Sequence, residues 1–129
     1  MAVLIDTSVL VAVERDRQLM AGLIAPEVRH ALSVVTVAEL LHGVHRATGS
    51  VAQQRAAFVE GLVAGFGALP IDLPVCRAHA IVSAELATRG TPVDANDLWI
   101  GATAIAHGFE VLALQGDFDS IPGVRRASV

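Results

Sequence analysis

Four acidic residues, widely separated in the sequence, are the side chains best suited to chemistry in this chain. Asp6 follows the apolar run Ala2–Ile5, Glu39 lies in SVVTVAEL, Asp97 in NDLWIGATAIAHG and Asp117 in ALQGDF. If they converge, like charges repel by about 1 kcal/mol per pair at 4 Å even in water. A divalent cation would remove that repulsion, and oxygen ligands without His or Cys favour Mg²⁺ or Mn²⁺. The chemistry expected of such a site is metal-dependent phosphodiester hydrolysis.

The acids can meet only if the rest of the chain folds as alternating strands and helices. Short apolar runs predict strands at Ala2–Ile5, Leu32–Val35, Ala68–Ile71, Glu110–Ala113 and Arg126–Val129. Longer periodic stretches predict helices at Val9–Glu14, Gln18–Ile24, Val37–Ala47, Val51–Phe66, Val75–Arg89 and Ala95–His107, with N-caps at Thr36, Ser50 and Asp94. The pattern favours an α/β fold: one domain over residues 1–129, with a central parallel sheet of four to five strands and helices on both faces.

This architecture predicts where the acids lie. Ligands of open parallel sheets bind outside the carboxyl ends of the strands. Two of the acids follow strands there, and the other two lie in first turns of helices that begin at the same edge. We therefore expect all four to be catalytic and to bind the metal, supported by their polar neighbours Thr7, Ser8, Asn96 and Gln115.

Each acid also has a simpler structural explanation. Glu39 could form a capping box with Thr36, and Asp97 could interact with the dipole of its helix. Asp6 could simply begin a turn, and Asp117 or Asp119 could cap the short turn FDSI. These explanations remain open for any one residue, but four like charges on one edge are harder to explain without a cation.

Composition limits the remaining possibilities. The chain has 129 residues, a single cysteine (Cys76), no lysine and a formal net charge of −4. The lone cysteine excludes an intrachain disulfide and fits a reducing compartment. Asp6 interrupts the apolar N-terminus before a signal or membrane segment could form, so we expect a cytoplasmic protein without a membrane association. The hydrophobic content of 53% and mean hydropathy of +0.59 predict an apolar interface with a partner.

Two histidines and three arginines are further candidates for contact with a ligand. His42 and His45 follow the second acid at helical spacing, but one such motif does not make a metal site, so we expect them to line the rim or pack. Arg15, Arg46 and Arg89 are candidate RNA contacts, because guanidinium groups bind phosphate oxygens in pairs. For any single arginine, a solvated helix face is the better explanation.

Four motifs carry a family resemblance: IDTSVL, TVAELLHG, NDLWIGATAIAHG and DFDSIPG. In this order and spacing, the chain resembles a PIN-domain ribonuclease, specifically the VapC-type toxin of a toxin–antitoxin system. The resemblance implies an endoribonuclease that uses Mg²⁺ or Mn²⁺, cuts structured RNA such as tRNA or rRNA, and is neutralised by a cognate VapB-type antitoxin. Asp6, Glu39 and Asp97 match the first three acids of the family.

The chain departs from the family at the fourth acid. Related sequences commonly read T-x-D-x-D-F, whereas this chain reads ALQGDF, with Ala113 and Gln115 in place of Thr and the first Asp. Asp117 is the acid that remains. Gln115 offers an uncharged carbonyl oxygen, which would weaken metal binding unless Asp117 compensates.

Apolar helices provide candidate interfaces. Gln18–Ile24, Val37–Ala47 and Val51–Phe66 hold more Ala, Val and Leu than one face of a sheet can bury. We expect them to form a groove for an antitoxin helix, and a second apolar surface to form a homodimer. The resemblance implies the same, with an antitoxin arginine reaching the acids.

Two alternatives remain open. A haloacid dehalogenase-like phosphatase also has an Asp after its first strand, but it needs a second Asp where this chain has Ser8. A PIN-like binding module weakened by Gln115 would have no catalytic activity. Receiver domains and P-loop enzymes depend on a Lys, which this chain lacks.

Overall fold

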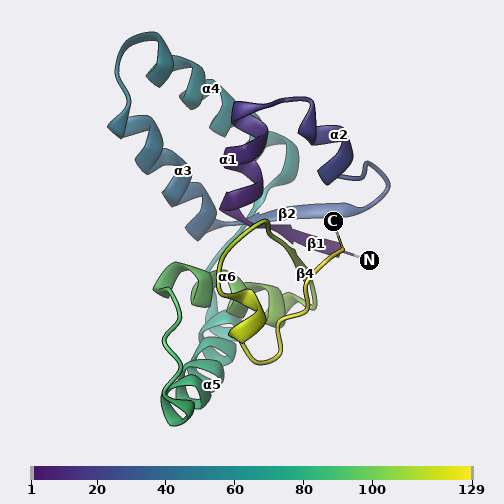
Figure 1. Ribbon diagram of the computed structural model, residues 1–129, viewed down its shortest axis with the longest axis vertical. Helices are drawn as coiled ribbons and strands as arrows, with labels where there is room; N and C mark the ends of the chain where they lie inside the picture. The colour runs from purple at the N-terminus through teal and green to yellow at the C-terminus, as the bar shows by residue number, and fades with distance from the viewer. Residues whose placement is uncertain (1, 129) are drawn as a thin grey trace.

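A four-stranded parallel sheet forms the centre of the computed structural model, which describes residues 2–128 (Figure 1). The strands are β1 (Ala2–Ile5), β2 (Arg29–Ser33), β3 (Ala68–Leu69) and β4 (Glu110–Leu112). They are hydrogen-bonded in the order β3-β2-β1-β4, so the strand that precedes the first acid is central. The predicted α/β class with a parallel sheet is therefore confirmed.

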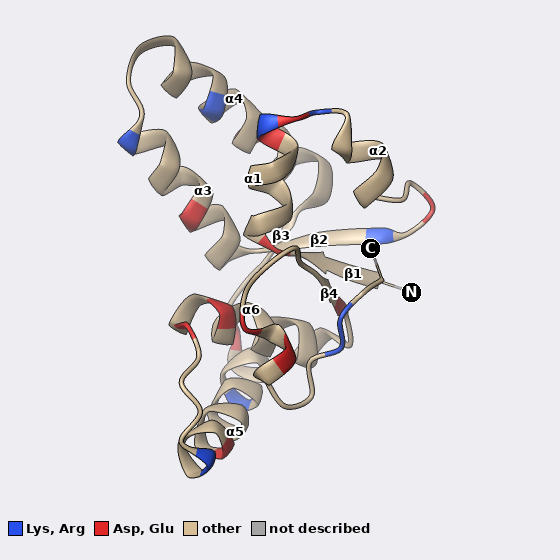
Figure 2. Cartoon of the chain, viewed as in Figure 1, with Lys and Arg blue, Asp and Glu red and all other residues tan. Residues whose placement is uncertain are grey.

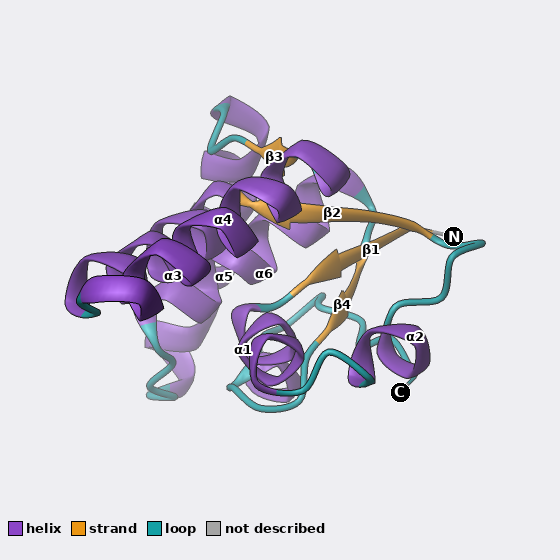
Figure 3. Cartoon of the chain, turned by 90° about the horizontal axis from the view of Figure 1, so that it is seen from above, coloured by secondary structure: helices purple, strands orange, loops and turns teal. Residues whose placement is uncertain are grey.

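Helices cover both faces of this sheet. They are α1 (Thr7–Arg15), α2 (Leu19–Leu23), α3 (Val34–Arg46), α4 (Gly49–Phe66), α5 (Leu73–Arg89) and α6 (Ala95–His107), followed by the 3₁₀ turn η1 (Phe118–Ser120). Helices α1 to α4 lie on one side, while α5 and α6 lie on the other (Figures 1 and 3). Among residues 2–128, no helix combines the length and hydrophobicity needed to cross a membrane.

Each face has its own hydrophobic core. Successive strand residues point to opposite faces, so the fully buried Leu4 and Ile5 belong to different cores. Ile5 packs in the cluster that includes Leu10 of α1, whereas Leu4 packs in the one that includes Ile100 of α6. Helices α1 and α6 are thus held on opposite faces of β1, and their N-termini meet at its carboxyl end.

The second strand and the helix after it begin earlier than predicted. β2 starts at Arg29, which pairs with Ala2, and α3 starts at Val34. The predicted strand Leu32–Val35 is wrong in its second half, because Ser33 caps the helix: its Oγ accepts a hydrogen bond from the Val35 amide at 3.1 Å. The β-branched valines suggested a strand, but the cap determines the helix start.

Smaller differences occur at other boundaries. α4 has Thr48, not Ser50, at its N-cap position, and α5 begins at Leu73 after the cap Asp72. The predicted strand Arg126–Val129 is reduced to one bridge between Val111 and Arg126, with Val129 outside the described residues. Helices α1 and α2 and strands β3 and β4 differ from prediction by one or two residues at their ends.

Candidate active site

Asp6 lies at the carboxyl end of β1 and is only 4% exposed. It caps α1, because its Oδ2 accepts hydrogen bonds from the Ser8 amide at 3.1 Å and from Ser8 Oγ at 2.6 Å. Oδ2 accepts both hydrogen bonds, and Oδ1 accepts no hydrogen bond from residues 2–128. Capping therefore accounts for one oxygen of this buried carboxylate and leaves the other for a ligand.

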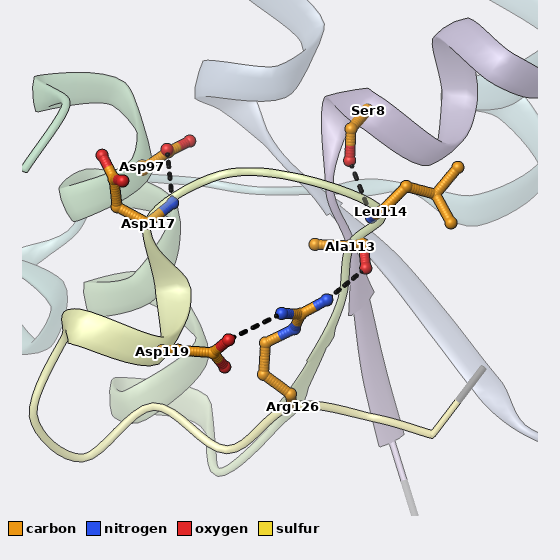
Figure 4. Close-up of polar contacts among 7 residues, drawn as sticks. All are labelled: Ser8, Asp97, Ala113, Leu114, Asp117, Asp119 and Arg126. Atoms are coloured by element: carbon orange, nitrogen blue, oxygen red, sulfur yellow. Dashed lines mark hydrogen bonds and ion pairs between the residues drawn. The ribbon is translucent and has the colours of Figure 1, made fainter.

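Ser8 connects this acid to the segment after β4. Its Oγ accepts a hydrogen bond from the Leu114 amide at 3.0 Å (Figure 4). The same hydroxyl group donates to Asp6. The Asp6 amide in turn donates to the Leu112 carbonyl at 2.8 Å. The end of β1 and the end of β4 are thus fixed to one another beside the buried acid.

Glu39 is held by side chains from two other helices. Thr7 Oγ1 of α1 donates to Glu39 Oε1 at 2.6 Å, and Asn96 Nδ2 of α6 donates to Oε2 at 3.3 Å. The capping-box explanation is wrong, because Ser33 is the N-cap and Thr36 is buried in the helix, where its Oγ1 lies 3.2 Å from Thr7 Oγ1. The structure therefore brings Thr7, Asn96 and Glu39 together at the predicted edge.

Asp97 lies in the first turn of α6, opposite Asp6. Asp94 caps this helix by accepting hydrogen bonds from the amides of Asn96 and Asp97, as predicted. The interaction of Asp97 with the helix dipole is not its only contact, because its Oδ2 also accepts a hydrogen bond from the Asp117 amide at 3.2 Å (Figure 4). Its carboxylate therefore joins α6 to the segment that follows β4.

The charges around Asp97 affect its protonation. The pKa of its carboxyl is raised to about 6, mainly by burial and also by the negative charges of Asp6, Asp94 and Asp117, while the hydrogen bond from the Asp117 amide lowers it. Figure 2 shows acidic positions on α3, near the start of α6 and in the segment after β4. Asp97 is thus a carboxylate whose charge is opposed by its surroundings.

These residues line one pocket of about 380 Å³. Its walls are formed by Asp6, Thr7, Ser8, Val11, Glu39, Asp97, Gln115 and Gly116. Three of the four predicted acids face this space. The fourth, Asp117, accepts a hydrogen bond from the Asp94 amide at 3.2 Å, while Gln115 lines the pocket.

Comparison with known proteins identifies the fold that carries this pocket. A sequence model of the PIN domain matches residues 3–124. Ribonuclease VapC5 of Mycobacterium tuberculosis (strain ATCC 25618 / H37Rv) is 39% identical over 126 residues, which cover 97% of this chain and 91% of that protein. The chain belongs to the VapC ribonucleases of the PIN-domain family. The resemblance seen in its four motifs is confirmed.

Solved structures agree with this membership. The crystal structure of VapBC-5, a member of the VapBC family of toxin–antitoxin systems from M. tuberculosis, matches the VapC-family chain with a TM-score of 0.79 and 37% identity, over 98% of both chains. VapBC2 from Rickettsia felis, bound to a DNA fragment from its promoter, gives a TM-score of 0.86 over 98% of both chains. At 20% identity, that second match supports the three-layer PIN-like fold alone.

The VapC-family pocket fits a small divalent cation coordinated mainly by water. Among residues 2–128, no three His, Cys, Asp or Glu side chains are grouped tightly enough to hold one ion together. Mg²⁺ characteristically binds one or two carboxylates and keeps several waters. Asp6 and Asp97, which interact electrostatically across the pocket, would supply that donor set, with Gln115 as an uncharged oxygen donor nearby.

The raised pKa of Asp97 predicts how the stability of the metal-free protein depends on pH. The folded state holds the proton up to about pH 6, whereas an ordinary Asp releases it near 3.8. Folding stability should therefore fall as the pH rises from about 4 to about 6. Asp97→Asn should remove most of that decrease. Melting temperatures of both proteins across this range, in a chelating buffer, test the prediction, and parallel curves would contradict it.

Gly116 gives the backbone the close approach that this site requires. Its φ is +113°, and an added Cβ would lie 3.0 Å from both Asp97 Oδ2 and the buried ring of Phe118. Gly116→Ala should lower the free energy of unfolding by about 1–3 kcal/mol and displace the carboxylate. Gly61→Ala is the control, because a Cβ there meets nothing within 4 Å and should add up to about 1 kcal/mol of stability. Urea denaturation measures both, and equal stability of the two variants would contradict the prediction.

The predicted RNA-contact arginines lie at helix ends. Arg15, Arg46 and Arg89 are the last residues of α1, α3 and α5. Arg15 is about 13 Å along α1 from the capped end, and Arg89 pairs with Glu85 on the surface. All three interact favourably with the helix dipoles. Their role in RNA binding stays a prediction.

Proposed function

We propose that this protein is a metal-dependent endoribonuclease toxin that cleaves structured RNA, such as tRNA or rRNA. The observation that supports this most strongly is the pair of acids, Asp6 and Asp97, facing one another in the polar pocket of a VapC-family chain. Mutual repulsion destabilises this arrangement until a cation binds. Proteins of this family are named ribonucleases, which suggests RNA as the substrate.

Asp6 and Asp97 are the proposed ligands of Mg²⁺ or Mn²⁺. When bound, the ion supplies an activated water and stabilises charge on the phosphate. Ser8 orients the Asp6 carboxylate through its short hydrogen bond. Glu39, fixed by Thr7 and Asn96, is placed to accept a proton or to contact a metal-bound water. Asp117 and Gln115 are proposed as additional ligands at the position where this chain differs from the fourth acid of the family.

A cognate VapB-type antitoxin is the proposed inhibitory partner. VapBC structures from several bacteria match this fold, and those proteins are toxin–antitoxin complexes. Exposed Leu19 on α2 and Val51 on α4 lie on helices of the predicted antitoxin groove.

A second apolar surface on α5 is the proposed homodimer interface, because Ile81 and Leu73 there are 70% and 61% exposed. We place the protein in the cytoplasm, where both RNA substrate and antitoxin would be available.

RNA cleavage with and without metal tests this function. Purified protein is incubated with labelled tRNA and rRNA, and separately with p-nitrophenyl phosphate, in Mg²⁺, Mn²⁺ or EDTA. The proposal predicts internal RNA cuts only with metal, and no phosphatase activity. Phosphatase turnover alone would favour a haloacid dehalogenase-like enzyme. Absence of both activities, with retained antitoxin binding, would favour a PIN-like binding module.

A further inference from the structure

A second hollow adjoins the acid pocket. It has a volume of about 660 Å³ and is lined by Thr7, Val35, Ala38, Glu39, His42 and Asn96. Thr7 and Glu39 line both spaces, so their 2.6 Å hydrogen bond is part of a shared wall. A ligand whose reacting group lies at Asp6 and Asp97 would extend past this wall into the second hollow. We call this second hollow the α3 groove.

Helix α3 forms one side of this groove. Val35, Ala38 and His42 follow one another at spacings of three and four residues, which places them on one stripe of the helix. Ala38 and His42 are exposed to solvent. The stripe therefore presents an apolar surface next to the acids and an imidazole ring one turn further along.

The start of α6 supplies the polar side of the groove. One N–H of the Asn96 amide donates to Glu39, which leaves its second N–H and its carbonyl oxygen to pair with a ligand. An amide beside apolar surface and an aromatic ring is the combination that binds unstacked bases of single-stranded RNA. The groove is large enough for one such nucleotide, since pockets for small organic ligands measure about 300–1,000 Å³.

We propose that the α3 groove binds the nucleotide next to the scissile phosphate, with its base against Val35 and Ala38 and in contact with His42. This inference rests on the proposed ribonuclease function and names a nucleotide subsite for it. The shared Thr7–Glu39 wall makes the groove continuous with the pocket where the phosphate would react. The Asn96 amide and the His42 ring in the same groove are the hydrogen-bonding and stacking groups that a base uses.

Two histidine variants test the subsite. His42→Ala removes the ring from the groove, and His45→Ala removes an exposed ring from the same helix that does not line it. The substrate is an oligoribonucleotide with one mapped cleavage site. His42→Ala should raise KM about tenfold with kcat nearly unchanged, because the contact is made in ground and transition states alike. His45→Ala should stay within twofold of wild type in both parameters.

Abasic substrates show whether the contact is to a base. Two further oligonucleotides lack the base on the 5′ or the 3′ side of the cleaved bond. The KM effect of His42→Ala should disappear with one of them and persist with the other. An effect that persists with both, or that His45→Ala reproduces, would overturn the proposal.

Binding without cleavage separates this inference from the proposed function. The anisotropy of a fluorescent oligoribonucleotide is measured in EDTA with wild type and both variants. If wild type cleaves no RNA in metal, the ribonuclease proposal fails, yet weaker binding by His42→Ala alone would still support the subsite. If His42→Ala weakens capture of an antitoxin helix while RNA binding is unchanged, the groove belongs to the protein partner and the proposal is wrong.

Discussion

Asp97→Asn should reduce RNA cleavage by about a thousandfold or more while leaving the metal-free protein at least as stable as wild type at neutral pH. The substitution keeps the shape of the side chain and an oxygen that can accept the Asp117 amide. It removes the charge that binds the ion, and with it interactions worth several kcal/mol in the transition state. It also removes the carboxyl group whose pKa is raised to about 6, mainly by burial and also by the charges of neighbouring acids.

Asp119→Asn is the matched control for this variant. Asp119 lies in η1, where its side chain is 79% exposed and pairs with Arg126 at 3.2 Å (Figure 4), and it does not line the pocket. It should retain cleavage within about twofold, because an exposed ion pair contributes little. If Asp97 only completed a helix terminus, Asp97→Asn would cost a few tenths of a kcal/mol and leave cleavage intact. Full activity of that variant would contradict the assigned site.

Chelation should abolish cleavage, and Mn²⁺ should restore it. The same ion should raise the melting temperature, because a ligand that binds only the folded state stabilises it by mass action, by about 2.7 kcal/mol at one hundred times its dissociation constant. In Asp6→Asn, Mn²⁺ should neither restore RNA cleavage nor raise the melting temperature, because the substitution removes the charge of the buried carboxylate. Differential scanning fluorimetry in EDTA and in millimolar Mn²⁺ measures the shift. A wild-type melting temperature that does not change would contradict a cation site.

The position of the acids could be predicted from sequence because it depends on topology. A parallel sheet brings every strand's carboxyl end to one edge, so residues that follow β1 and β4 or begin α3 and α6 approach one another wherever the exact boundaries fall. The predicted start of α3 is three residues too late, but Glu39 still lies at the predicted edge of the sheet. Strands with consecutive apolar residues, such as Leu4 and Ile5, likewise predicted a sheet covered on both faces, and both residues are fully buried.

The partners of the acids could not be predicted, because they are long-range contacts. Glu39 fits a capping box by spacing, yet it is bound by Thr7 and Asn96, which lie 32 and 57 residues away. No local pattern distinguishes these alternatives. Gly116 was also missed as a site residue, although a glycine between Gln115 and Asp117 is a signal that the backbone approaches another group closely.

Mn²⁺ binding measured by isothermal titration calorimetry, in buffers of different ionisation enthalpy near pH 6, tests the central claim most directly. If the acid pocket exists for a cation, binding must displace the proton that Asp97 holds, so part of one proton should be released for each ion bound. Asp97→Asn should bind Mn²⁺ at least a hundredfold more weakly and release no proton. Equal affinity in the two proteins, or wild-type binding without proton release, would contradict the account.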